Sequence, residues 1–307
     1  MTAIAEFAPR ARHRFLFDRA EVLGPLFIAP AILYVFALVA LPFFLAIYYS
    51  ISAFTIFDPS YRFVGAKNFL DVMQSDVFRR TLANTFIFTI GAQIIGLLLG
   101  KFAAMLLMKE FPGRGLARAL VVLPWAVPVS LATLAWQWMF DSLYSVINWT
   151  LIAVGLVDAA HPPQWLGQQD LAMIAVTVVH AWRLFPFGVV IFIAGFTSVP
   201  KDILDAATVD GAGFWRRNYQ IILPIIMPIV VIGLIFGTVF TFTDLSVVYL
   251  LTRGGPINAT QVLGSLGFQV GILSGDVAHG AVICLFLFPF LLLVVIFMLR
   301  ALRRREI

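Results

Sequence analysis

Three ionisable side chains interrupt long apolar runs of this 307-residue sequence: Lys101, Arg183 and Asp244. The guanidinium of Arg183 can donate hydrogen bonds to the hydroxyls of a sugar or to the oxygens of a phosphate. A charge in the apolar core of a membrane costs about 2.5–3.5 kcal/mol on insertion scales, so such a residue indicates function by default. Arg183 therefore either lines a substrate path or forms an ion pair with another span or with a partner subunit.

The other polar groups in these runs admit different interpretations. Asp244 lies near the end of its run, where a sugar contact, a gating contact and simple surface exposure are all open. Lys101 lies near the inner end of another run, and we expect its long stem to carry the ammonium group towards the interface. We expect His180 to be a hydrogen-bonded interior residue and not a ligand.

No catalytic or nucleotide-binding pattern accompanies these residues. Gly96, Gly100 and Lys101 resemble part of a phosphate-binding loop, but that loop needs four residues between its glycines and Ser or Thr after the lysine. Here three residues separate the glycines and Phe102 follows the lysine. Zinc-ligand spacings, a nucleophile elbow and paired catalytic carboxylates are also missing from the sequence. We therefore expect a non-catalytic protein that binds no cofactor or metal itself.

The elements that must position these residues are membrane helices. The sequence is 61% hydrophobic and only 12% charged, which is typical of an integral membrane protein. An apolar run of about 20 residues can cross the hydrocarbon core as a helix, and unpaired strands cannot satisfy their backbone there. The sequence predicts an all-α integral membrane protein with six spans, near residues 26–49, 85–108, 116–140, 171–196, 221–245 and 280–302.

The positive charges predict how these spans are oriented. With both termini in the cytoplasm, fourteen Lys and Arg residues lie on the inner side and five on the outer side. Such a bias is the usual signature of topology. The net charge of +5 is thus explained without a nucleic-acid partner, and the basic ends are expected to rest on the inner leaflet of the lipid bilayer.

The polar segment between spans four and five, within residues 198–220, is too long for a simple turn. Ser198 is the expected N-cap of a first helix, which has Pro200 in its first turn. Gly211 and Gly213 are expected to end this helix, and Phe214 to begin a second one that leads into span five. One side of the first helix is predicted to be apolar, from residues Ile203, Leu204, Ala207 and Val209.

This segment carries a family resemblance. The order Asp-Ala-Ala-x-x-Asp-Gly-Ala, followed by Ile-x-Leu-Pro, resembles the signature loop of binding-protein-dependent ABC transporter permeases. The resemblance implies coupling helices that dock into an ATP-binding subunit. Family members usually begin with Glu, whereas this chain keeps the charge with the shorter Asp205. The implied coupling residues are Asp205, Ala206, Ala207, Asp210, Gly211, Leu223 and Pro224.

Further motifs resemble the sugar-importing branch, which includes maltose, trehalose and glycerol-3-phosphate permeases. They are Phe63-Val64-Gly65 with Asn68-Phe69, then Asn84-Thr85, and then Leu251-Thr252 with Gly254-Gly255-Pro256. The last motif usually has Gly where this chain has Arg253. The resemblance implies the type I ABC importer permease fold in a bacterial inner membrane. It also implies a second related permease, two ATP-binding subunits that bind ATP and magnesium, and an extracytoplasmic sugar-binding protein.

These features predict an order of parts along the chain. Residues 1–24 are an N-terminal cytoplasmic segment, 25–80 the first span and outer loop, 81–302 the core permease domain, and 303–307 a cytoplasmic tail. The substrate pathway candidates are Arg183 and Asp244. The main alternative is an ion-coupled secondary transporter, although such folds usually have buried carboxylates for coupling. The sequence places no Asp or Glu at mid-membrane depth.

Overall fold

The computed structural model describes residues 20–303, and this part of the chain is built from helices with no β-strand. Five of these helices are long and apolar enough to cross a membrane, or six if one bent pair counts as a span. The all-α prediction is confirmed. The basic residues at positions 1–19 and 304–307, and the ends predicted there, lie outside the described part.

The first span belongs, up to Tyr48, to a compact unit of its own. It is made of α1 (Ala20–Val35), a π-helical stretch η2 (Phe36–Ala40) and α2 (Leu41–Ser50). Within these elements, the 27 residues from Gly24 to Ser50 form a candidate membrane span, which matches the predicted span at 26–49. The remaining helices belong to the second unit, residues 49–307.

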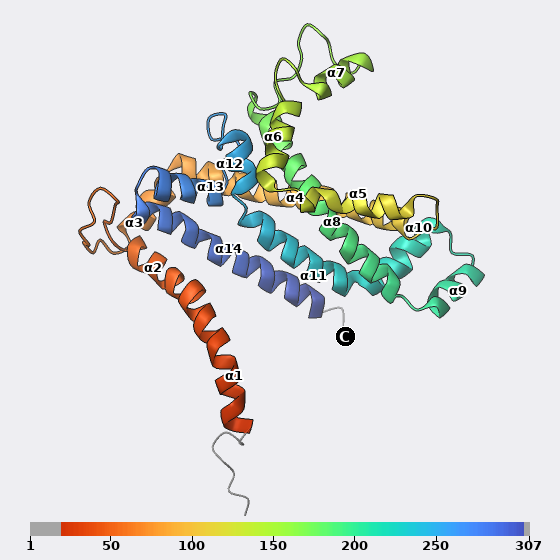
Figure 1. The fold of residues 1–307 in the computed structure, drawn as a ribbon, viewed down its shortest axis with the longest axis horizontal. Helices are drawn as coiled ribbons and strands as arrows, with labels where there is room; N and C mark the ends of the chain where they lie inside the picture. The colour runs from red at the N-terminus through yellow and green to blue at the C-terminus, as the bar shows by residue number, and fades with distance from the viewer. Residues whose placement is uncertain (1–19, 304–307) are drawn as a thin grey trace, which may run out of the picture. The chain divides into compact units, whose positions relative to one another are not determined.

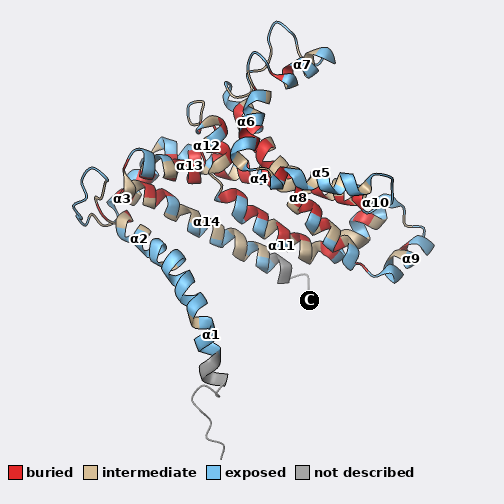
Figure 2. Cartoon of the chain, in the orientation of Figure 1, coloured by how far each residue is buried: buried red, intermediate tan, exposed pale blue. Residues whose placement is uncertain are grey.

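Four long helices run back and forth through this second unit: α4 (Asp76–Leu107), α8 (Gln169–Ser198), α11 (Leu223–Phe242) and α14 (Val277–Arg303) (Figure 1). Their buried residues face one another along the bundle (Figure 2). Of the two ends of the bundle, one carries α9 (Lys201–Val209) and α10 (Phe214–Arg216), and the other carries α3 (Lys67–Gln74), α12 (Ser246–Thr252) and α13 (Leu263–Phe268). We call these the α9 end and the α12 end.

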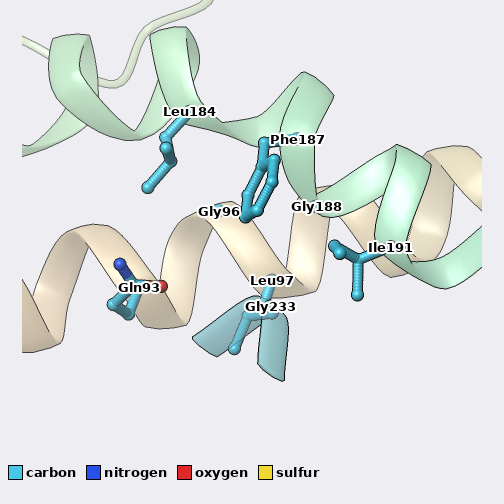
Figure 3. A pocket seen from close by; sticks show the side chains of 8 residues that line it. All are labelled: Gln93, Gly96, Leu97, Leu184, Phe187, Gly188, Ile191 and Gly233. Carbon is cyan, nitrogen blue, oxygen red and sulfur yellow. The ribbon is translucent and has the colours of Figure 1, made fainter. Parts of the chain in front are cut away.

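Small residues let α4, α8 and α11 approach closely at the centre of the bundle (Figure 3). A Cβ atom added at Gly100 of α4 would lie 2.8 Å from the backbone carbonyl carbon of Gly188 in α8. On α11, a Cβ at Gly233 would lie 2.8 Å from the Ile191 side chain. The space left at this seam is only about 10 Å³, no more than a single water molecule needs, so the seam is a packing contact and not a ligand site.

The third predicted span, residues 116–140, is not one straight helix. It consists of α5 (Arg114–Ala126) and α6 (Val129–Met139), which meet at an angle of 98°. Val127 between them is extended, with φ −73° and ψ 131°, because a residue before proline disfavours the helical region. Pro128 then supplies no N–H to continue the helix. The predicted span at 116–140 is therefore present as a bent pair of helices, and the sequence prediction did not include the break at Pro128.

At the α12 end, the Asn84-Thr85 motif contacts the loop that follows the motif at residues 251–256. The side-chain amide of Asn84 in α4 donates hydrogen bonds to the backbone oxygens of Asn258 at 3.0 Å and Gln261 at 3.1 Å. The hydroxyl of Thr85 accepts one from the Leu263 amide at 2.9 Å. These contacts fix the loop after α12 onto α4.

Replacing Asn84 by leucine is therefore expected to destabilise this loop. The substitution keeps the approximate size of the side chain and removes the amide donor from both carbonyls. The buried Gln261 carbonyl is left without a donor, at a cost of about 1–3 kcal/mol, whereas the half-buried Asn258 carbonyl still accepts from the Gln261 amide at 3.4 Å. Hydrogen exchange of the 254–263 amides should become faster in Asn84→Leu. An unchanged exchange rate would show that these hydrogen bonds do not hold the loop.

Candidate functional site

The segment between α8 and α11 folds as a helix, a glycine turn and a second helix, as predicted. Helix α9 ends at Val209. Gly211 in the turn has φ +70°, a backbone conformation that residues with a side chain disfavour. The chain resumes at Phe214 and continues through α10, the π-helical η3 (Arg217–Ile222) and α11 as a single helix of 29 residues. The second helix is thus an extension of span five beyond its apolar part.

The structure corrects two details of this segment. Ser198 is the last residue of α8 and its hydroxyl donates back to the Gly195 carbonyl, so it does not cap α9. The residue at the N-cap of α9 is Pro200. The apolar residues of α9 do not share one buried side either, because Val209 is 88% exposed while Ala207 is only 4% exposed.

The predicted coupling residues divide into an outer and an inner set. Asp205, Ala206, Asp210 and Gly211 are exposed, as is Pro224 at the start of α11. Ala207 is buried and Leu223 half-buried, against the body of the protein. The segment therefore presents a surface of two carboxylates, small residues and the exposed Val209 at the α9 end of the bundle (Figures 1 and 2).

Arg183 lies midway along α8 and Asp244 lies just beyond the end of α11, and these two pathway candidates are next to each other. The Nη1 atom of Arg183 is 3.9 Å from Oδ2 of Asp244. The Asp244 side chain is only 15% exposed, which excludes simple surface exposure. Its Oδ1 accepts a hydrogen bond from the Val247 amide at the start of α12. This one carboxylate thus joins α8, α11 and α12.

His180 belongs to the same group, and the interior role expected for it is confirmed. It is 4% exposed, and its Nε2 lies 3.1 Å from the Thr241 hydroxyl. Thr241 also accepts a hydrogen bond from the Gln93 amide, at 3.2 Å. The other ring nitrogen of His180, Nδ1, lies 3.9 Å from Asp244. The polar network therefore extends from α4 through α11 to α8.

His180, Arg183 and Asp244 line a cavity of about 200 Å³. Trp125, Leu184 and Phe240 supply its apolar wall. Nδ1 of His180 and Nε of Arg183 are buried and have no hydrogen-bond partner among the described residues. Buried polar atoms usually have a hydrogen-bond partner. Two such atoms without a partner beside a cavity could therefore form hydrogen bonds with a polar ligand.

Some of these residues could not be found from the sequence. Trp125 reaches the cavity because α5 ends at the 98° bend, and the sequence prediction lacked that bend. Gln93 and Thr241 carried no signal, because single polar residues in apolar helices are common packing residues. The Arg183–Asp244 contact had a weak signal only, in two opposite charges on neighbouring spans.

The chain belongs to the family of binding-protein-dependent transport system inner membrane components, which it matches over residues 96–307. This membership argues against the ion-coupled alternative.

Individual relatives agree with this family. The chain is 31% identical over 274 residues to the trehalose/maltose transport system permease protein MalF of Thermococcus litoralis, covering 89% of this chain and 91% of the relative. It is 28% identical over 292 residues to the sulfoquinovosyl glycerol transport system permease protein SmoG of Agrobacterium fabrum, covering 93% and 92%. A bacterial alginate ABC transporter, solved with an alginate pentasaccharide-bound periplasmic protein, contains a similar fold, with a TM-score of 0.78, 19% identity and coverage of 95% and 98%.

Proposed function

We propose that this chain is the permease subunit of an ATP-driven importer of a sugar, delivered by an extracytoplasmic binding protein. The observation that carries the proposal is the cavity at Arg183 and Asp244, where charged hydrogen-bonding groups face aromatic side chains. Sugars present both kinds of surface, hydroxyls at their edges and apolar faces that pack on aromatic rings. The relatives are named as permeases for trehalose and maltose or for sulfoquinovosyl glycerol, and these names support the same substrate class.

The size of this cavity favours a pathway that two permeases share. At about 200 Å³ it is smaller than the roughly 300–1,000 Å³ of pockets that enclose small-molecule ligands. Trp125 and Phe240 in its wall remain 50% and 57% exposed. A second, related permease would complete the wall and enclose the sugar.

At the α9 end, the coupling segment would dock into one of two ATP-binding subunits, which supply ATP and magnesium. Closure of those subunits on ATP would move α9 as one body with the continuous helix Phe214–Phe242, which we call the α10 helix, because a packed helix is rigid. ATP can drive the permease only by binding more tightly to one of its two conformations. In the predicted orientation this end is cytoplasmic, in a bacterial inner membrane.

A double-mutant cycle at Arg183 and Asp244 tests whether these residues serve the substrate or only each other. Arg183→Gln and Asp244→Asn each remove one charge and leave the other buried, so each is expected to lower thermal stability. The double variant Arg183→Gln/Asp244→Asn has no unpaired charge and should recover stability.

Sugar uptake by reconstituted transporter separates the two roles. If the groups contact substrate, the double variant remains impaired in uptake although it is stable, with a loss of about tenfold or more for the charged hydrogen bonds. The control Arg253→Gln, at the α12 end outside the cavity, is expected to leave uptake unchanged. Recovery of both stability and uptake in the double variant would make the pair structural and remove this site from the pathway.

A further inference from the structure

A second cavity, of about 390 Å³, lies near the α9 end between the last turns of α4 and the start of the α10 helix. Two lysines border it, Lys101 within α4 and Lys109 just beyond its end. The rest of its wall is largely apolar and aromatic and includes Phe102, Trp215 and Tyr219. Phe102 is 64% exposed and Trp215 69% exposed, so the cavity opens along the side of the bundle.

The charge of Lys101 has no acidic partner in the described part of the chain. Its ammonium group lies 3.9 Å from the centre of the Tyr219 ring, a cation–π contact that only partly offsets the charge. None of the ion pairs within the described residues includes Lys101 or Lys109. Lys101 nevertheless sits in a helix apolar enough to span a membrane. Near the inner end of such a helix, an unpaired lysine attracts anionic groups.

We infer that this cavity binds an anionic phospholipid, with its phosphate between Lys101 and Lys109 and an acyl chain along Leu98 and Phe102. The lysines supply the charge complementarity, and the exposed apolar residues of α4 match a hydrocarbon chain. Trp215 and Tyr219 have amphipathic rings of the kind that lie at the headgroup level of a membrane. Under the predicted orientation this site faces the inner leaflet, where anionic lipids attract basic residues.

The bound lipid would connect α4 to the helix that carries the coupling segment. Lys101 and Lys109 belong to the α4 side of the cavity, whereas Phe214, Trp215 and Tyr219 belong to the α10 side. A headgroup that contacts both sides stabilises the arrangement in which they are close. The lipid composition of the membrane would then influence how firmly the coupling segment is held.

The test uses the full chain with its partner subunits, reconstituted in phosphatidylcholine nanodiscs that contain photoactivatable phosphatidylglycerol or, in a matched sample, photoactivatable phosphatidylcholine. Peptide mapping of the adducts is expected to place phosphatidylglycerol on residues 98–109 and 214–219. Each lysine is expected to contribute about a fivefold preference for the anionic lipid. Lys101→Gln should therefore lower the labelling about fivefold, while Lys101→Arg should keep it.

The control is Lys67→Gln, which removes a charge from α3 at the other end of the bundle and should leave labelling unchanged. Equal labelling by the two lipids would overturn the inference, as would adducts that map only to segments outside residues 98–109 and 214–219. Loss of labelling in excess inorganic phosphate would assign the site to a soluble anion instead. The comparison of phosphatidylglycerol with phosphatidylcholine labelling on the unmodified chain tests the inference even if Lys101→Gln does not fold.

Discussion

Replacing Gly211 by proline is expected to leave the protein inserted in the membrane and to lower ATP-driven uptake by about 5- to 150-fold, the usual range of a coupling free energy. Gly211 has φ +70°, whereas proline requires a φ near −65°. Its amide also donates to the Thr208 carbonyl at 3.1 Å, and proline has no N–H. The turn between α9 and the α10 helix must therefore change direction, and the exposed coupling surface changes with it.

Gly155→Pro is the matched control. Gly155 has φ +75° and its amide donates to the Ile152 carbonyl at 2.9 Å. A Cβ atom added at either glycine would meet no atom within 4 Å. Gly155 lies after α7 (Val146–Ala153), away from the coupling segment (Figure 1). Uptake and ATP hydrolysis are measured together in proteoliposomes, and equal losses in the two variants would mean that Gly211 matters only for local folding.

Replacing Gly100 by alanine is expected to destabilise the helix bundle as a whole. The new methyl group would lie 2.8 Å from the carbonyl carbon and 2.9 Å from the Cα atom of Gly188. Both atoms belong to the backbone of α8, so no side chain can rotate away. Overpacking of this kind costs about 1–3 kcal/mol or more, and it opposes the gain of up to about 1 kcal/mol that alanine brings to a helix.

Gly96→Ala, one turn earlier on the same helix, provides the comparison. A Cβ atom there meets no atom within 4 Å, so only the helix-propensity gain remains and stability should be equal or higher. Thermal unfolding in detergent should show a lower transition for Gly100→Ala than for Gly96→Ala. The same transition temperature in both would contradict the close contact between α4 and α8.

The four-residue spacing of Gly96 and Gly100 is typical of a face on which helices pack closely, but the sequence does not name the partner helix. Gly188 follows Pro186 in α8 and shows no small-residue spacing with its neighbours. Only the three-dimensional crossing of α4 and α8 brings it to Gly100. The long helices were predictable because the length of an apolar run decides whether it can form a membrane span. The bend at Pro128 was not, because other prolines in this chain lie inside helices without such a break.

For the candidate site, the sequence identified single residues better than their arrangement. Arg183 and Asp244 stood out because a charge in an apolar run is expensive. Their proximity, the His180–Thr241 contact and the aromatic wall at Trp125 depend on helix rotation and on the broken third span. The coupling segment was predicted more fully, because its glycine turn and helix-forming residues are local features.

Sugar uptake is most directly measured in proteoliposomes that contain this chain, its partner permease, the ATP-binding subunits and the sugar-binding protein. We expect uptake to require both ATP and the binding protein, and to stop when ATP is depleted even with an ion gradient maintained. Uptake that persists on the ion gradient without ATP would contradict this expectation.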